Sequence, residues 1–568
     1  MDWQTECKER IVSEDYMDFI ITENRMGNFK DLPEEDLCRQ NIGIIYESIH
    51  LPRITQDTFQ AGRYDYSMIP SCYTLIDTQA MGQVGISQIQ GIPSLSLYGE
   101  GVMIGFIDTG IAYEDAVFRN TDGSTRIERI WDQTIQTGTP PEGFLYGTEY
   151  TRDMINQALS NEHPLEVVPS IDAIGHGTSI ASLAAGGVNT ENQFTGAAPR
   201  ASIAMVKLKP IKKLLRDYYL VNPNTPCYQE IDIMTGLKYL HELANRLGLP
   251  LVVCIALGTN LGSHTGSSPL CGLMETYANF SNRVIVTGGG NEANQKHHYM
   301  EQFTSKSESK RVEIVVQEGV KGFILELWTS IPNVMAVSIH SPSGEVIPVT
   351  SVRKRSNLKH DFVFEQTSVN IDYRLIVEKT GSELIFMRFE DTTPGIWTVT
   401  VYPIDIADGV FHMWLPMKEF LTGTAYFINS NPDTTLTEPS NTYSPITVAY
   451  YNGSNNAISV DSGRGYTRNN VVKPDFAAPG VDVITAMPGN RFAPHTGSSV
   501  SAAITTGAAA ILLQWAYYYD KDPDVDSLEV KNYLLLGAQQ DSAFTYPNKT
   551  FGYGRLDLYN TFLKLSGY

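Results

Sequence analysis

Four short segments of this 568-residue chain carry side chains that together could attack a carbonyl group. Asp108 ends the apolar run 102–107, His176 lies between two glycines, and Ser499 opens a helix rich in small residues. A carboxylate, an imidazole and a hydroxyl can form an activated nucleophile, because the acid orients the base that takes the hydroxyl proton. Asn291 follows three glycines and could donate its side-chain amide to the oxyanion that the attack produces.

Each of these segments also has a structural explanation when it is taken alone. The Asp108 segment could be a turn or half of an aspartic-protease site, but aspartic chemistry needs a second carboxylate and the chain has only one Asp-Thr-Gly. A lone histidine is more often structural, and Ser498 or Ser499 could simply cap a helix. The loop before Asn291 lacks the Lys and Ser/Thr of a phosphate-binding loop, so a glycine-rich turn is the alternative there.

Other candidate residues are given structural roles. His495 precedes the glycine turn before Ser499, and we expect a loop residue that lines the cleft. His297 and His298 are adjacent, so their side chains point apart, which favours a solvated loop over a metal site. We predict no metal ion and no cofactor. We expect three tryptophans to be core residues rather than carbohydrate ligands: Trp328, Trp397 and Trp414.

The elements that must position the four segments alternate between strand and helix. From about residue 80, apolar strand candidates alternate with helical ones, which indicates a parallel sheet with helices on both faces. Catalytic groups of such sheets commonly lie at the carboxyl ends of the strands. The expected elements are 102–107, 179–185, 201–207, 231–247, 251–257 and 284–287.

A strand-rich insertion interrupts this α/β pattern. Between about 301 and 435 the helical period disappears, and short strands separated by Gly/Pro turns predict an antiparallel, jelly-roll-like β-sandwich. The α/β pattern resumes at 436–568, with a strand at 446–451 and a long apolar helix from about 499 to 519. Residues 1–79 form a separate small α+β unit, with strands expected at 20–21, 43–49 and 72–77 and a helix start at 33–36.

Composition excludes several classes of function. The net charge of −21 argues against nucleic-acid binding, which needs clustered Lys and Arg. The six cysteines have no Cys-x-x-Cys spacing, so we expect them to stay reduced. The N-terminus is charged where a signal peptide would be apolar, so we expect no signal peptide. The sequence contains no uninterrupted apolar run of about 18 residues, so we also expect no membrane span. We therefore expect synthesis in the cytoplasm.

Together, these fragments resemble the subtilisin-like serine proteases (subtilases). The chain order Asp108, His176, Ser499 matches the order of the subtilisin triad. The segment after Gly497 is similar to the family's Gly-Thr-Ser-Met-Ala motif, with Ser498 in place of Thr and Val500 in place of Met. The resemblance covers roughly residues 80–300 and 440–565.

The resemblance implies roles for further residues. It makes Asn291 the oxyanion donor and places the substrate against the strand Ala256-Leu257-Gly258, where Ala256 replaces the family's Ser. It makes residues 1–79 a prodomain that assists folding and occupies the cleft, cut from the protease at about Gln79-Ala80. The implied partners are a protein or peptide substrate and the chain's own prodomain.

The insertion between Asn291 and Ser499 narrows the resemblance to the clostridial spore germination proteases (Csp-type). That resemblance implies limited proteolysis of a zymogen, a cortex hydrolase, with the protein retained in the spore. Some members of that family lack triad residues, whereas this chain keeps all three. A pseudoprotease that acts as a scaffold or sensor, and a bacterial subtilase unrelated to germination, remain the alternatives.

Overall fold

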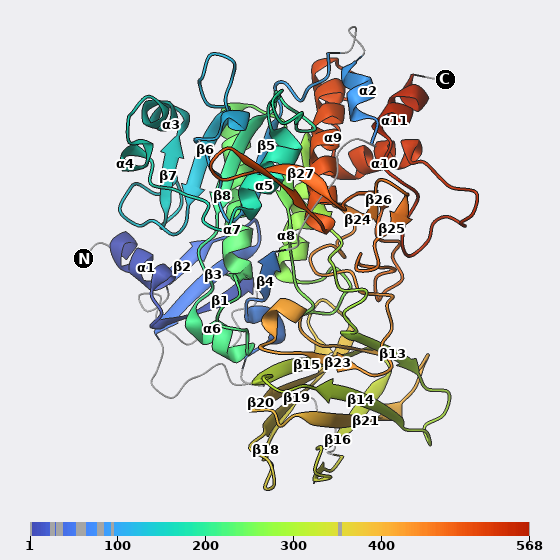
Figure 1. Cartoon of the computed structure of the whole chain (residues 1–568). Helices are drawn as coiled ribbons and strands as arrows, with labels where there is room; N and C mark the ends of the chain where they lie inside the picture. The colour runs from blue at the N-terminus through green and yellow to red at the C-terminus, as the bar shows by residue number, and fades with distance from the viewer. Residues whose placement is uncertain are drawn as a thin grey trace.

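The structure is a computed structural model of the whole chain, and it describes residues 3–22, 29, 38–52, 64–75, 84–91, 96–349 and 355–566. Figure 1 shows a small N-terminal unit in blue beside an α/β body, with a β-sandwich below that body. This arrangement confirms the predicted fold class. The predicted helix start at 33–36 and the predicted cleavage site at Gln79-Ala80 lie outside the described residues.

A nine-stranded, largely parallel sheet forms the centre of the α/β body, in the order β25-β24-β12-β10-β5-β8-β6-β7, with β26 paired to β24. Strands β7 and β25 run antiparallel to their neighbours. The strands are β5 (Met103–Asp108), β6 (Ile127–Asp132), β7 (Thr148–Thr151), β8 (Ser202–Lys207), β10 (Leu251–Ile255), β12 (Arg283–Gly288), β24 (Ile446–Asn452), β25 (Ala457–Ile458) and β26 (Phe476–Pro479).

Helices cover both faces of this sheet because alternate strand residues point to opposite sides. In β5, Ile104 and Phe106 join the core under α5 and α9, whereas Met103 and Ile107 join the core under α7 and α8. The helices are α2 (Ile86–Gln90), α3 (Arg152–Leu159), α4 (Pro164–Val167), α5 (His176–Ala185), α6 (Lys213–Tyr218), α7 (Glu230–Leu247), α8 (Pro269–Ala278), α9 (Ser498–Tyr518), α10 (Ser527–Gly537) and α11 (Leu558–Leu565). Two short 3-10 turns, η4 (Ala116–Phe118) and η5 (Lys418–Phe420), and the hairpin of β27 (Val483–Met487) and β28 (Arg491–His495) complete this part.

Helix α9 is the one helix in the described ranges with the length and apolar composition to cross a membrane. In this fold 94% of its most apolar 18-residue stretch is buried, and the helix packs against α5 and strands β10, β12 and β24. It is therefore accounted for as a core helix.

The N-terminal unit is a helix, α1 (Trp3–Val12), on an antiparallel sheet of order β1-β3-β2. Its strands are β1 (Tyr16–Thr22), β2 (Cys38–Asn41) and β3 (Tyr46–Pro52), and η3 (Tyr66–Met68) leads to β4 (Cys72–Leu75). The sequence analysis did not identify α1 or β2. Its expectation of six reduced cysteines was also wrong, because Cys7 of α1 and Cys38 of β2 form a disulfide. Pairing patterns between cysteines this far apart carry no local sequence signal.

A buried ionic cluster fastens this unit to the α/β body. The Asp18 carboxylate of β1 accepts hydrogen bonds from Lys212 Nζ at 2.6 Å and Gln229 Nε2 at 2.9 Å, both from the α/β body. His50 Nδ1 of β3 lies 2.6 Å from the same carboxylate. Burial alone would favour the neutral acid, but Lys212 and His50 hold the pKa of Asp18 well below its ordinary value. Breaking such a buried pair leaves an uncompensated charge, so the cluster specifies where the unit docks.

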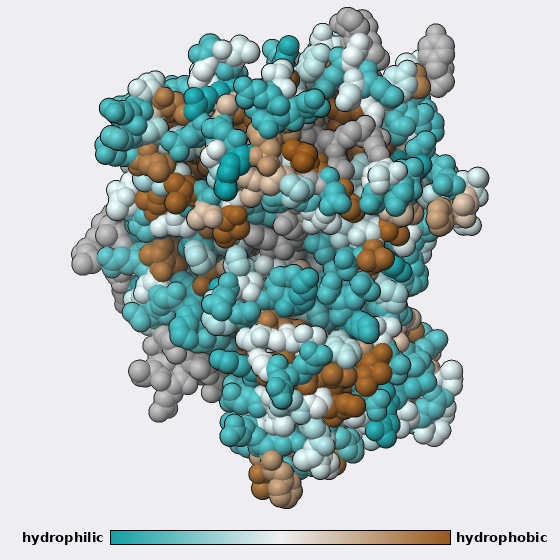
Figure 2. All heavy atoms as spheres, viewed as in Figure 1, coloured by the Kyte–Doolittle hydropathy of each residue, from teal (hydrophilic) through white to brown (hydrophobic). Residues whose placement is uncertain are grey.

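The sandwich consists of two antiparallel sheets around one apolar core. One sheet has the order β13-β22-β15-β20-β19-β18 and the other β17-β16-β21-β14-β23. The strands are β13 (His298–Gln302), β14 (Lys310–Val316), β15 (Gly322–Ser330), β16 (Val334–His340), β17 (Val346–Ile347), β18 (Arg355–Asp361), β19 (Ser368–Val377), β20 (Ser382–Glu390), β21 (Gly395–Asp405), β22 (Val410–Trp414) and β23 (Ala425–Phe427). Figure 2 shows an apolar patch at the lower tip of the sandwich. Val363 and Phe364, between β18 and β19, are among its most exposed apolar residues, at 80% and 81%.

The three sandwich tryptophans are buried, which confirms that they are core residues. Trp397 lies inside the sandwich, whereas Trp328 and Trp414 belong to a cluster shared with the N-terminal unit and the α/β body. The prediction of a solvated loop at His297 and His298 was wrong. Both imidazoles are buried: His297 bonds Glu292, and His298 packs against Trp414.

A stack of histidines joins the sandwich to the α/β body. The His264 ring lies 4.0 Å from the Trp414 ring and nearly parallel to it. On the sandwich side, His298 Nε2 lies 3.0 Å from His412 Nδ1. Burial lowers the pKa of His264 to about 4 and that of His298 to about 3, and it also lowers the pKa of His412. The junction therefore contains neutral imidazoles.

This junction predicts a loss of stability in weak acid. The unfolded chain binds protons at these histidines below about pH 6.5 while the folded chain does not, so the free energy of unfolding falls as the pH drops from about 6.5 towards 4. Each histidine contributes a slope of about 1.4 kcal/mol per pH unit. Urea unfolding followed by tryptophan fluorescence between pH 7 and 4.5 measures the slope. We expect His298→Gln to reduce it and the exposed control His163→Gln to leave it unchanged; equal slopes in wild type and His298→Gln would contradict the assignment.

Candidate active site

Asp108 and His176 meet at the carboxyl edge of the sheet. Asp108 is the last residue of β5, and its carboxylate lies 2.7 and 2.9 Å from His176 Nδ1. The Thr109 N–H also donates to Asp108 Oδ1 at 2.7 Å, which fixes the carboxylate. Both side chains are buried, at 2% and 5% exposure. Because a carboxylate only accepts hydrogen bonds here, the imidazole proton sits on Nδ1 and Nε2 is the basic nitrogen.

His176 is the first residue of α5, and glycines on either side let the helix start there. Gly175 has a φ of +88°, a left-handed conformation that favours glycine. A Cβ at Gly177 would lie 2.2 Å from the Gly110 carbonyl oxygen, so only glycine lets α5 approach the loop after β5 this closely. Gly175 thus allows the chain to turn into α5, and Gly177 allows α5 to pack closely against the loop after β5.

Asp172 connects the end of β5 to the start of α5, whereas the sequence alone suggests only that it adds negative charge near the cleft and does not fix its position. Its carboxylate accepts from Thr109 Oγ1 at 2.8 Å, from the Gly175 N–H at 2.8 Å, and from the N–H and hydroxyl of Thr178 at 2.9 and 2.7 Å. Thr109 in turn accepts from the Gly177 N–H at 2.9 Å. The signal that could have found Asp172 is an acidic residue just before an apolar helical run, the usual pattern of a helix start.

Ser499 lies in the first turn of α9, directly after Gly497 and Ser498. Helix α9 packs against α5, which carries His176. Backbone N–H groups of a first helical turn have no intrahelical acceptor, so the Ser499 N–H is available to an anion. Among the described residues the buried Ser499 Oγ makes no hydrogen bond. Hydroxyl–base bonds are often formed only when substrate binds, so the assignment of Ser499 as nucleophile stays a prediction.

Asn291 lies beside the start of α9, where the predicted oxyanion donor must be. Its Oδ1 accepts from the Ser498 N–H at 3.1 Å, and the Gly290 N–H donates to Ser498 Oγ at 3.0 Å. With Oδ1 engaged in this way, the amide group Nδ2 is the part of the side chain that can donate to a ligand. Asn291 and the Ser499 N–H are thus on adjoining segments, as a two-donor oxyanion site requires.

The predicted substrate strand is occupied by the N-terminal unit. Strand β4 lies between β11 (Leu257–Gly258) and β9 (Tyr228–Gln229) in a three-stranded antiparallel sheet. Thr74 is opposite Gly258, and Leu75 is opposite Leu257; Ala256 precedes β11 and is buried. The sequence analysis did not identify β9 as the second wall of this cleft. A chain segment bound by two strands in this way is held in the extended form that a protease needs.

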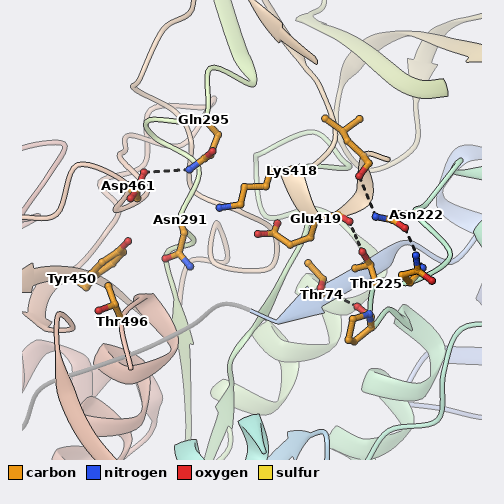
Figure 3. Close-up of a pocket in the computed structure, with 13 residues that line it drawn as sticks. Thr74, Asn222, Thr225, Asn291, Gln295, Lys418, Glu419, Tyr450, Asp461 and Thr496 are labelled. Carbon is orange, nitrogen blue, oxygen red and sulfur yellow. Dashed lines mark hydrogen bonds between the residues drawn. The ribbon is translucent and has the colours of Figure 1, made fainter. Parts of the chain in front are cut away.

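A cavity of about 620 Å³ adjoins Asn291. Figure 3 shows its lining, in which Thr74 of β4 lies across the space from Asn291 and Thr496. Lys418 and Glu419, from the segment between the sandwich strands β22 and β23, also point towards Asn291. The sequence analysis did not anticipate any contribution of the insertion to the site.

His495, which we expected in a loop lining the cleft, and Asp115 both contact the β27–β28 hairpin. His495 ends β28, where its Nε2 lies 2.8 Å from Met487 Sδ. Asp115 accepts from the N–H groups of Gly489 and Asn490 in the turn of the β27–β28 hairpin. Burial raises the pKa of Asp115 to about 6. Both residues therefore hold the hairpin that packs on α5.

Comparison with known proteins agrees with this geometry. The model of the subtilase family matches residues 99–384 and 425–554. The chain is 27% identical over 205 residues to the subtilisin-like protease SBT3.6 of Arabidopsis thaliana, which covers 32% of the chain and 25% of that protein. It is 19% identical over 475 residues to the C5a peptidase of Streptococcus pyogenes, 78% of the chain and 37% of that protein. The chain thus spans well under half of the length of these relatives.

A solved structure covers nearly the same extent as this chain. It is the CspB protease of Clostridium perfringens, with 31% sequence identity and a TM-score of 0.76, covering 85% of this chain and 98% of that one. The family match and the similarity to this structure both extend over most of the chain, and the chain belongs to the subtilase family.

Proposed function

We propose that this chain is a serine endopeptidase that cuts itself once and then activates another protein by limited proteolysis. The observation that carries the proposal is the bond between the Asp108 carboxylate and His176 Nδ1 at 2.7 Å, at the mouth of a cleft that already holds an extended strand. Such a cleft presents a peptide carbonyl to the nucleophile in one orientation.

The mechanism follows from the positions of these groups. His176 takes the proton of Ser499 through Nε2 as the hydroxyl attacks the scissile carbonyl, and it later gives the proton to the leaving amine. Asp108 holds the tautomer that this transfer needs and stabilises the imidazolium. Asn291 Nδ2 and the Ser499 N–H stabilise the oxyanion, and one such donor is worth about 10²–10³ in turnover.

Self-cleavage is supported by the path of β4. This strand leads from the N-terminal unit through the cleft, and the chain continues from Leu75 towards residues that include Gln79 and Ala80. A cut at about Gln79-Ala80 would separate the prodomain from the protease. The buried Asp18–Lys212 pair would then keep the prodomain docked, since breaking it would leave a buried charge without a partner.

The proposed substrate in the cell is the propeptide of a zymogen, and the proposed setting is spore germination. Support comes from the inserted sandwich and from the similarity to the CspB protease over 98% of its length. The proposal includes synthesis in the cytoplasm and retention in the spore. The main alternative, a scaffold or sensor with the same fold, predicts that Ser499 does not react.

Replacement of the nucleophile tests the proposal directly. We expect a fluorophosphonate probe to label the wild type and not Ser499→Ala, because only an activated serine reacts. N-terminal sequencing should find a fragment that starts near Ala80 in wild type and an intact chain in Ser499→Ala. The control Ser307→Ala, on an exposed turn, should behave as wild type. An unlabelled, uncut wild type would favour the scaffold.

Asp172 predicts an effect on turnover from a residue that touches no substrate. Without its carboxylate, the bonds from Thr109, Gly175 and Thr178 are lost and His176 is no longer held in line. We expect Asp172→Ala to lower kcat about 10²-fold with little change in KM, because small displacements of a catalytic group cost about this much. Asp172→Asn keeps an acceptor and should recover part of the loss. Steady-state kinetics on a peptide substrate measures both constants, and the exposed Asp122→Ala is the control. If Asp172→Ala kept the wild-type kcat, the positioning role would be ruled out.

A further inference from the structure

Two cysteines lie close together where the N-terminal unit meets the α/β body. Cys72 begins β4 of that unit, and Cys227 directly precedes β9 of the α/β body. The two strands run antiparallel, with Cys72 opposite Gln229. Extending this register by two residues places Thr74 opposite Cys227, and the Thr74 hydroxyl donates to the Pro226 carbonyl at 2.9 Å. The two cysteines therefore occupy diagonal positions of one strand pair.

Both thiols point into the same buried core. Side chains alternate along an extended chain, so Cys227 lies on the same face as Gln229, which is the partner of Cys72. Diagonal neighbours on one face of an antiparallel pair are close enough for their side chains to interact. The two cysteines belong to one apolar cluster, together with Ile69 and Tyr219, and they are 0% and 1% exposed. The pair is thus shared between the N-terminal unit and the α/β body.

The surroundings of the pair act on its reactivity in two directions. Burial raises the pKa of the Cys72 thiol, and its hydrogen bond with the Cys227 thiol adds to the rise. The Arg216 guanidinium lowers that pKa in turn, because a nearby cation favours the thiolate. Arg216 is held in place by its Nη1, which donates to the carbonyls of Asn222 and Thr225 at 2.8 and 3.0 Å. Since the thiolate is the form that attacks a disulfide, the fold places a cation where exchange needs one.

A bond between these two cysteines would differ in its effect from the disulfide that the chain already contains. Cys7 and Cys38 are joined within the N-terminal unit. Cys72 lies on the strand in the cleft, whereas Cys227 lies on the wall of the cleft. A cut at about Gln79-Ala80 would leave Cys72 in the prodomain. The bond would therefore outlast the cut and would join two separate chains.

We propose that Cys72 and Cys227 form a disulfide by exchange with a low-molecular-weight disulfide, such as oxidised glutathione, and that this bond holds the N-terminal unit in the cleft. The inference goes beyond the proposed endopeptidase function, because the bond can form in a chain that cuts nothing.

The exchange takes two steps. The Cys227 thiolate attacks one sulfur of the oxidant, which forms a mixed disulfide and releases one reagent thiolate. The Cys72 thiolate then attacks the Cys227 sulfur, which forms the protein disulfide and releases the second reagent thiolate. The two protein thiols lose two protons and two electrons in all, and the oxidant is reduced to two thiols. A reducing dithiol reverses the reaction and leaves β4 held by non-covalent contacts.

Peptide mapping of the full chain tests the bond without a substrate. Purified wild type is incubated with oxidised glutathione, unfolded in urea with an alkylating reagent, digested with trypsin and analysed by mass spectrometry. We expect two peptides joined through Cys72 and Cys227, and dithiothreitol should separate them. The alkylated thiols should fall from four per chain to two, because the chain has four free cysteines besides the Cys7–Cys38 disulfide. On a denaturing gel without reductant, residues 1–79 of a self-cleaved chain should stay attached to the protease.

Serine variants provide the matched controls. Cys72→Ser and Cys227→Ser should each lose the joined peptides, whereas Cys254→Ser, which removes a buried thiol of β10 outside the pair, should keep them. The wild-type map decides by itself if a serine variant fails to fold. Four alkylated thiols in oxidised wild type, with Cys7 and Cys38 still joined, would overturn the inference while leaving the endopeptidase proposal intact. A wild type that carries the bond but runs as one uncut chain under reducing conditions would support the inference and contradict self-cleavage.

Discussion

The buried carboxylate of Asp172 is the point on which the geometry of the site depends. It accepts four hydrogen bonds, one from the loop after β5 and three from the start of α5. Hydrogen bonds to an ionised acceptor are stronger than neutral ones, and a buried carboxylate is stable only when it is satisfied in this way. Because β5 ends at Asp108 and α5 begins at His176, the same four bonds also set the distance between acid and base. The relative position of Asp108 and His176 therefore depends on Asp172, which belongs to neither side of that pair.

A second constraint is the shared use of β4. The strand belongs to the N-terminal unit, yet both of its hydrogen-bonding edges are occupied by the α/β body, through β9 and β11. The edges that would receive a substrate are thus covered by the chain itself, which also protects them from pairing with other chains. The unit cannot leave without breaking this sheet and the Asp18–Lys212 pair. The same contacts that attach the N-terminal unit to the α/β body therefore also keep β4 in the cleft.

Much of the α/β body could be predicted from sequence because its signals are local. Apolar runs gave β5, β8 and β12 to within a residue or two, and small residues followed by a long apolar stretch gave α9. Asp108 and His176 were found because each carries a distinct flanking motif. The role of Asp172 was missed since it comes from partners on two segments, the loop after β5 and the start of α5, and no single motif records that. His297 and His298 were misjudged because adjacent polar residues suggest a loop, whereas the sandwich buries both.

The place of the insertion accounts for the part of the site that sequence could not reveal. The chain leaves the α/β body directly after Asn291 and Glu292, and segment 417–421, between the sandwich strands β22 and β23, lies beside the same cavity. The sandwich holds β13 and β22 as neighbours, which fixes these two segments relative to each other. A domain joined in this way cannot shift without moving the wall that contains Lys418 and Glu419. An inserted domain of this kind is therefore structurally a part of the cleft, even though its strands carry none of the triad.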